Sequence, residues 1–404
     1  MERVLSVRGG ARAWALLAGS WLAQGAMAAD DAQPWLLGDW NGHRSALAER
    51  GLDMEFVATS DVMAVVDGGR SRGVEALGNL DVVFNLDTGT AGWWQNGTFR
   101  VHIIGAVGGF PSQRVGDIQI SSNYEAIVNT VTFYGLSYEQ RLLDDRLGLL
   151  VGLHEINEDF YLTEMSTLFM NSSLGIGIDV TQAGPSTFPV TAPGVRLRLN
   201  WTPNTYLLAA VYDGVAGDPD NPYGPQIQFD HGDGVFAIAE AGLLGGEGRY
   251  YKLGVGGWYR TANFDDLDGV PRDDNSGIYA IAESDLWRQE DGRGVGVFTQ
   301  LGFADGDNNQ IATYVGAGIN WTGPYACRPA DVAGLAMTHA RNGDHFMRLD
   351  PTAERAETAL ELTYLVTPAP WLSVQPDLQY VIDPGTDGAL DDALVLGLRM
   401  QIAL

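Results

Sequence analysis

Apolar and polar residues alternate one by one along much of this chain of 404 residues. In GVRLRLNWTP, residues 194–203, every second side chain is apolar, and two arginines and an asparagine lie between them. Because successive side chains of a β-strand point to opposite faces, this segment is predicted to be a strand with one apolar and one charged face. The same alternation predicts further strands along the chain, at residues 81–87, 99–103, 252–260, 294–303, 314–323, 357–366 and 371–382.

The segments between these strands carry turn signals and differ in length. VDGGRSRG and ADGDNN are short, whereas DGVAGDPDNPYGP and DDLDGVPRDDNSG are long. Tight turns at one end and longer loops at the other are typical of a transmembrane barrel. One helix is predicted, over residues 41–50 within the segment 39–51, with Gly51 as its C-cap. The sequence contains no linker or internal repeat, which predicts a single domain over residues 29–404.

No segment after the first 28 residues approaches the roughly 18 consecutive apolar residues that a membrane helix needs. A membrane location would therefore require a closed barrel, because only helices and closed sheets satisfy their backbone groups in lipid. Dividing the remaining 376 or so residues into strands of ~10 residues plus connections predicts roughly 16 to 18 strands, enough to enclose an aqueous channel. The final segment, ALVLGLRMQIAL, has an unbroken apolar row on one face, as expected of a closing strand.

The first 28 residues have the order of parts of a secretory signal peptide. Three arginines precede the apolar residues 13–23, and Ala26-Met27-Ala28 supplies the small residues of a cleavage site. Without this leader the chain keeps 21 basic and 50 acidic residues, a net charge of −29, which would repel nucleic acid. The single cysteine, Cys327, excludes an internal disulfide and a cysteine-rich zinc site. These features indicate an exported bacterial envelope protein, with no cofactor, metal or catalytic site expected.

Several segments also match, in order, the pattern of one protein family. They are LLGDWNGHRSALAERGLDMEF near the start, Gly68-Gly69 in VDGGRSRG, GLSYEQRLLDDRLGLLVGLHEINEDF, Phe169-x-Asn171 in LFMNSSLG, APGVRLRLNWTPNTYLLAAVYDG, GPYACRPADVAGLAMTHA, and the segment from ETALELTYLV through QPDLQYVIDPG to the final strand. In these segments the chain resembles the carbohydrate-selective outer-membrane porins of the OprB family. The resemblance implies a 16-stranded antiparallel barrel in the bacterial outer membrane, with a charged and aromatic constriction. It also implies passive diffusion of monosaccharides such as glucose.

Charged and amide side chains on the polar strand faces are the candidate pore residues. Arginine offers donors and carboxylates offer acceptors to sugar hydroxyls, and a permeating sugar needs several weak contacts of this kind. Alternation with apolar neighbours predicts pore-facing positions for Arg196, Arg198, Glu361, Gln375, Asp377, Gln379 and Arg399, and Glu240 is added from the most apolar segment.

Four further candidates lie outside the alternating segments. Arg70 and Arg72 flank Ser71 in a glycine-rich turn, where a solvated hairpin tip is the open alternative. Asn157 and Asp159 lie where, in the family that the chain resembles, the strand gives way to a loop folded into the lumen.

Two alternative functions remain open from the sequence. The chain could be a general or cation-preferring channel, in keeping with its negative charge, or an exported soluble all-β protein that binds or processes carbohydrate. The expected partners are small carbohydrates, outer-membrane lipid and lipopolysaccharide, and the barrel-assembly machinery. The sequence leaves open whether the protein is a monomer or a homotrimer.

Overall fold

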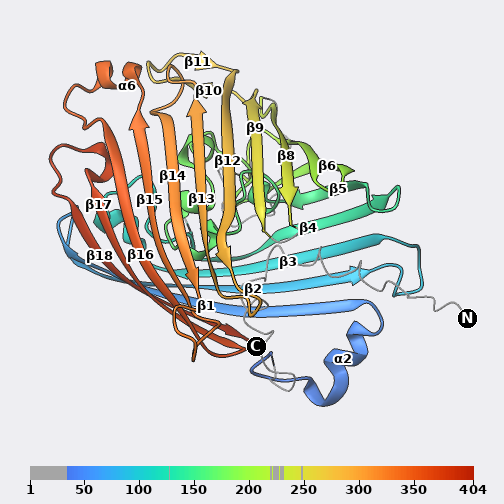
Figure 1. The fold of residues 1–404 in the computed structure, drawn as a ribbon. Coiled ribbons are helices and arrows are strands. Elements are labelled where there is room, and N and C mark those ends of the chain that lie inside the picture. Colours follow the sequence, from blue (N-terminus) through green and yellow to red (C-terminus); the bar gives the residue numbers. More distant parts are fainter. Residues whose placement is uncertain (1–33, 127, 219–220, 222–226, 228–231, 247–248) are drawn as a thin grey trace, which may run out of the picture.

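A closed barrel of sixteen antiparallel strands dominates the structure, a computed structural model that describes residues 34–404 except 127, 219–220, 222–226, 228–231 and 247–248 (Figure 1). The strands follow one another around the wall, and β1 closes it by pairing with β18. This confirms the predicted fold class and strand number. The signal peptide expected at residues 1–28 lies outside the described residues.

The wall strands contain the segments predicted from alternation. They are β1 (Leu52–Asp67), β2 (Gly73–Asp87), β3 (Gly97–Gly108), β4 (Thr130–Leu142), β5 (Leu147–His154), β6 (Ala192–Thr202), β7 (Thr205–Asp213), β8 (Val235–Gly245), β9 (Tyr251–Arg260), β12 (Asn275–Arg288), β13 (Gly294–Ala304), β14 (Ile311–Thr322), β15 (Val332–Asn342), β16 (Ala356–Ala369), β17 (Leu372–Ile382) and β18 (Ala393–Ala403). A small second sheet pairs β10 (Phe264–Asp265) with β11 (Pro271–Arg272).

The two rims of the barrel differ in the length of their connections. At one rim, adjacent strands are joined by turns as short as residues 203–204 and 370–371. The opposite rim carries the long connections, above all residues 109–129 and 155–191. Both α2 and the C-terminal end of β18 lie at the rim of short turns (Figure 1). By the general rule for such barrels, this rim is periplasmic and the long loops are extracellular.

The outer surface of the wall is apolar and the inner surface is largely polar. On β18, Leu396, Leu398 and Met400 are exposed, whereas Val395 and Arg399 are buried. The exposed face therefore needs an apolar solvent, which is the arrangement of a barrel in lipid and the reverse of a soluble β-sandwich. The soluble alternative is thus excluded. Among the described residues, no helix is long and apolar enough to cross a membrane.

Two extracellular connections fold back into the barrel. We call residues 109–129 loop L2, which contains α3 (Pro111–Val115), and residues 155–191 loop L3. Loop L3 contains η3 (Ile156–Glu158), η4 (Ser166–Leu168), α4 (Ser172–Gly175) and α5 (Ile178–Thr181). Its side chains Phe160, Tyr161, Met170 and Val180 have no exposed surface. Because these apolar residues pack against the inner wall, in two separate clusters, loop L3 fills much of the interior.

The N-terminal helix is shorter than the predicted 41–50 segment. A 3-10 turn, η2 (Trp40–Gly42), leads into α2 (His43–Ala48), because Asn41 adopts a left-handed backbone conformation. Arg44 of α2 lies 3.9 Å from the ring centre of Trp35. It donates to the Leu404 carbonyl oxygen at 3.1 Å and to that of Met54 at 2.8 Å. The N-terminal segment thereby ties the end of the chain to β1 at the barrel seam.

Two further short helices, α6 (Asp344–Leu349) between β15 and β16 and η5 (Pro384–Thr386) between β17 and β18, lie in connections at the extracellular rim.

Candidate functional site

The interior of the barrel has a dry half and a wet half. Inward side chains of β8, β13, β16 and β17 have almost no exposed surface, as Glu240 at 1% and Gln379 at 0% illustrate. On β2–β6, by contrast, the inward side chains of Asp81, Arg100, Glu139 and Arg198 keep between 17% and 29% of their surface exposed, although Arg196 and His102 keep only 7% and 8%. Exposed surface inside a closed wall faces water-filled space. The candidate path for a solute therefore runs beside β2–β6.

In the dry half, wall side chains hold the backbone of the inner loops. The Glu361 carboxylate accepts from the amides of Met170 at 2.5 Å and Asn171 at 2.9 Å. Gln375 donates to the Leu168 carbonyl at 2.7 Å. These contacts fix loop L3 on β16 and β17.

The same half contains three more of the residues predicted to face the pore. Gln379 donates to the Ser121 carbonyl of loop L2 at 2.8 Å and to the Asp377 carboxylate at 3.0 Å. Glu240 accepts from the Tyr161 amide of loop L3 at 2.9 Å. All five of these residues face inward, as the alternation predicted for the four on β16 and β17, but their partners are loop or wall groups. Contact of Glu240, Glu361, Gln375, Asp377 and Gln379 with a solute stays a prediction.

A charged network occupies the wet half, with Asp159 of loop L3 at its centre. The Asp159 carboxylate accepts from Arg196 Nε at 2.8 Å and lies 3.2 Å from His154 Nε2. Arg198 is 3.9 Å away, and Arg196 also contacts Glu139 at 2.8 Å. Burial alone would raise the pKa of Asp159, but the nearby positive charges, above all Arg196, hold it below its ordinary value. Asp159 is therefore ionised.

The network continues along β3 towards loop L3. Arg100 lies 3.5 Å from Glu158, whose other oxygen is 3.5 Å from His154. On the same strand, His102 Nε2 lies 2.9 Å from the Asp81 carboxylate of β2. Donors and acceptors thus alternate along one side of the interior.

Aromatic rings border this network. Phe188 of loop L3 lies between Tyr124 of loop L2 and Tyr134 of β4, with ring centres 6.2 and 6.0 Å apart. Tyr134 in turn meets His102 edge to face at 5.1 Å. Burial raises the pKa of Tyr124 to about 12, so its hydroxyl is neutral at physiological pH. We call Tyr124, Tyr134 and Phe188 the aromatic cluster.

Arg399 joins the aromatic cluster to the barrel seam. Its guanidinium lies 4.5 Å from the ring centre of Tyr124. It forms a two-pronged contact with Asp61 of β1, at 2.8 and 2.7 Å, and donates to the Asn123 side chain at 2.7 Å. Arg399 therefore positions the tip of loop L2 next to β1 and β18.

The remaining sequence candidates lie apart from the network or support it. Arg70 and Arg72 are exposed at the hairpin tip between β1 and β2, where Arg72 pairs with Asp67. Asn157 donates to the Gly175 carbonyl at 3.1 Å, within loop L3. Of the twelve candidates, the structure brings Arg196, Arg198 and Asp159 together in the wet half.

Sequence reasoning missed part of the site. Arg100 and His102 alternate with apolar residues in FRVHI, so the rule applied to Arg196 could have found them. Tyr124 and Phe188 lie in loops, where no periodic pattern indicates which way a side chain points.

One buried carboxyl in loop L3 predicts a dependence of stability on pH. Asp179 of α5 is fully buried, accepts from the Tyr161 hydroxyl at 3.1 Å, and has no cationic partner in the described part of the chain. Gly302 of β13 makes room for it, because a Cβ there would lie 2.1 Å from the carboxyl group. Burial raises the pKa of Asp179 to about 7.

The raised pKa means that the folded state favours protonated Asp179. This stabilisation is fully present below the unfolded pKa of about 3.9 and is lost as the pH rises through 7. Asp179→Asn should remove this pH-dependent fall in the free energy of unfolding, because asparagine does not ionise. At pH 8 the free energy of unfolding of the variant should exceed that of the wild type by up to about 4 kcal/mol. Denaturant unfolding at pH 5 and pH 8 measures the difference. Equal pH dependence of the two proteins would refute this assignment.

Comparison with known proteins places this geometry in context. A family model described as "Carbohydrate-selective porin, OprB family" matches residues 71–404. "Porin B" of Pseudomonas aeruginosa is 26% identical over 423 residues, covering 91% of this chain and 90% of the relative. "Putative porin QuiX" of Acinetobacter baylyi is 23% identical, covering 91% and 92%.

Solved structures share the fold. The high-pH structure of Pseudomonas putida OprB matches with a TM-score of 0.82 and 20% identity, covering 92% of this chain and 99% of that one. The outer-membrane channel DcaP of Acinetobacter baumannii matches with a TM-score of 0.56 and 12% identity, covering 87% and 97%.

Proposed function

Since this chain belongs to the carbohydrate-selective porins of the OprB family, we propose that it admits glucose-sized neutral sugars along the wet half of its barrel. The protein is an outer-membrane channel and not an enzyme, so transport is diffusion down a gradient with no chemical step. The proposal includes residues 1–28 as an export leader and residues 29–404 as the mature barrel domain.

The observation that carries the proposal is the meeting of the charged network with the aromatic cluster. A sugar ring has apolar C–H faces, which aromatic rings cover, and a rim of hydroxyls, which need donors and acceptors. Phe188 and Tyr124 offer the rings, while Arg100, Glu158 and Asp81 offer partly exposed donors and acceptors beside them. Such contacts replace water around the sugar without holding it tightly.

The charge balance of the wet half favours a neutral solute over a cation. Three guanidinium groups, on Arg100, Arg196 and Arg198, lie among the carboxylates of Asp81, Glu139, Glu158 and Asp159, with acidic and basic partners 2.8–3.9 Å apart, and Glu55 and Glu155 lie near them. Opposite charges in contact largely cancel each other's field at a distance. The net charge of the whole chain, −27 with the leader included, therefore produces little electrostatic field along the path of the solute. This argues against the cation-preferring alternative.

Removing one ring tests the role of the aromatic cluster. Phe188→Ala should weaken block of the channel current by glucose about fivefold, because one aromatic contact contributes roughly 1 kcal/mol. The measurement is the glucose concentration that halves conductance in planar bilayers. Phe133→Ala is the matched control, because Phe133 of β4 is 56% exposed on the outer wall. Unchanged glucose block in Phe188→Ala would contradict the sugar path.

A further inference from the structure

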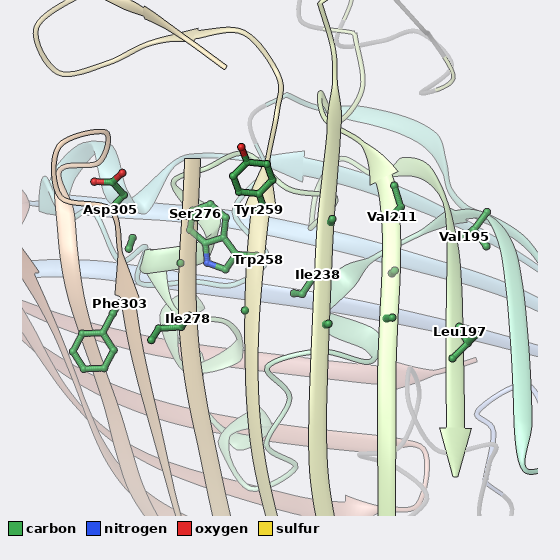
Figure 2. Close-up of a pocket in the computed structure, with 17 residues that line it drawn as sticks. Val195, Leu197, Val211, Ile238, Trp258, Tyr259, Ser276, Ile278, Phe303 and Asp305 are labelled. Atoms are coloured by element: carbon green, nitrogen blue, oxygen red, sulfur yellow. The ribbon is translucent and has the colours of Figure 1, made fainter. Parts of the chain in front are cut away.

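Loop L3 leaves the barrel wall and returns to it at neighbouring points. It follows β5 and leads into β6, where His154 and Ala192 are partners across the two strands. The strand β6 is oriented by Val195 and Leu197, which line an apolar groove on the outer wall (Figure 2). The first residue of the loop, Glu155, therefore lies next to the residues that end the loop.

A tight turn near the end of loop L3 carries Phe188. The Thr187 amide donates to the Val190 carbonyl at 3.0 Å, and the Val190 amide donates to the Thr187 carbonyl at 2.9 Å. The Ser186 hydroxyl, directly before the turn, donates to the His154 carbonyl at 2.7 Å. These bonds close the turn and attach its start to the end of β5, but none of them is made by Phe188.

Glu155 holds the tip of this turn. Its Oε1 oxygen accepts from the Phe188 amide at 3.3 Å and from the Thr187 hydroxyl at 3.2 Å. The same carboxyl group lies beside the hydroxyl of Tyr134, whose ring centre is 6.0 Å from that of Phe188. Glu155 is therefore placed between the backbone of one member of the aromatic cluster and the side chain of another.

The three rings of the aromatic cluster differ in exposure. Tyr134 is buried, at 4%, whereas Tyr124 and Phe188 are each partly exposed. Tyr134 thus supports the Phe188 ring from behind, and the exposed surfaces of Phe188 and Tyr124 are left for a solute. A small movement of the turn at residues 187–190 would change how far the Phe188 ring reaches into the path.

We propose that Glu155 is a positioning residue for sugar recognition, which places the Phe188 ring and thereby sets the preference of the channel for pyranose rings over open-chain polyols. The inference rests on the proposed sugar path and adds a residue that acts without touching the solute. A pyranose offers a C–H face to an aromatic ring, whereas an open-chain polyol has no such fixed face. The position of Phe188 should therefore matter for the first solute and not for the second.

The contact needs an acceptor at position 155 and not a negative charge. Burial disfavours the charged form and raises the pKa of Glu155, and the nearby Glu158 carboxylate acts in the same direction. A neutral amide oxygen can accept from the Phe188 amide and the Thr187 hydroxyl in the same way. Glutamine should therefore replace Glu155, whereas alanine should not.

Block of the channel current by glucose and by sorbitol, measured in planar bilayers, tests the proposal. Glu155→Ala should raise the glucose concentration that halves the current roughly two- to fivefold, because at most the contact of one ring is lost. Sorbitol block and the open-channel current should stay unchanged, whereas displacement of the whole loop would alter both. Glu155→Gln should retain the wild-type glucose block. Glu290→Ala, at an exposed periplasmic turn, is the control for loss of a glutamate.

Glu155→Asp keeps the charge but withdraws the oxygen by one methylene group. It should show the same selective loss of glucose block to a smaller extent, and it provides the measurement if Glu155→Ala does not fold. A role of the charge alone would instead leave Glu155→Asp like the wild type and make Glu155→Gln as weak as Glu155→Ala. Either of these results would overturn the proposal.

A double variant shows whether Glu155 acts through Phe188. In a Phe188→Ala background, Glu155→Ala should weaken glucose block no further, because the same ring contact is already lost. Fully additive effects would overturn the proposal, and so would unchanged glucose block in Glu155→Ala when Phe188→Ala weakens it. That last result would leave the sugar path intact, whereas unchanged block in Phe188→Ala would refute the sugar path itself.

Discussion

Replacing Arg196 by methionine should destabilise the barrel and weaken its glucose block. The substitution leaves Asp159 buried without its closest cation, and breaking a buried ion pair on one side costs about 3–5 kcal/mol. It also displaces loop L3, because Asp159 connects that loop to β6. Denaturant unfolding and bilayer conductance with glucose measure the two effects.

A double substitution distinguishes the effect on stability from the effect on glucose block. Arg196→Met with Asp159→Leu removes both partners and should recover much of the lost stability, since an apolar pair can replace a buried ion pair at little cost. Glucose block should remain weaker than in the wild type, because Arg196 and Asp159 are gone from the charged network while Arg100, Glu158 and Asp81 remain. Arg72→Met, at an exposed pair on the rim, should change neither property. Normal glucose block in the double variant would show that sugar transport does not require the Arg196–Asp159 pair of the charged network.

Glu361→Ala should release loop L3 from the dry half of the barrel. The substitution leaves the Met170 and Asn171 amides without their acceptor, and each unsatisfied buried amide costs about 1–3 kcal/mol. The loop is expected to move into the wet half or out of the barrel, so the open-channel conductance should change and loop L3 should become sensitive to protease.

Glu361→Gln provides the matched comparison, because its amide oxygen can still accept from one of the two backbone groups. Its effect on conductance should be smaller than that of Glu361→Ala. If both variants kept the wild-type conductance and protease resistance, the hypothesis that Glu361 anchors loop L3 would be wrong.

The sequence predicted the barrel wall well because strand alternation is a local property. Leu197 and Arg196 differ by one position, so their faces follow from the period of two residues alone. The same argument placed Glu361 and Gln379 on the inner face. It could not indicate that loops L2 and L3 would cover them, since loop packing depends on contacts between residues more than a hundred positions apart, as in Gln379 to Ser121.

The aromatic part of the site shows the limit of pattern reasoning. Phe188 and Tyr124 come from two separate loops and meet only because both loops fold into the barrel. The resemblance to the porin family implied an aromatic constriction but identified no residue for it. The division into a wet and a dry half likewise emerged from the exposure of charged side chains in the folded chain.

Accessibility of single cysteines tests the central claim most directly. In a Cys327→Ser background, Ser137→Cys would place a thiol opposite Arg100, where the serine keeps 8% of its surface exposed, and Thr338→Cys would place one in the dry half, where the threonine is fully buried. A membrane-impermeant thiol reagent should reduce the current of the Ser137 variant, with glucose slowing the reaction, and should leave the Thr338 variant unaffected. Rapid modification at position 338, or none at position 137, would contradict a path along β2–β6.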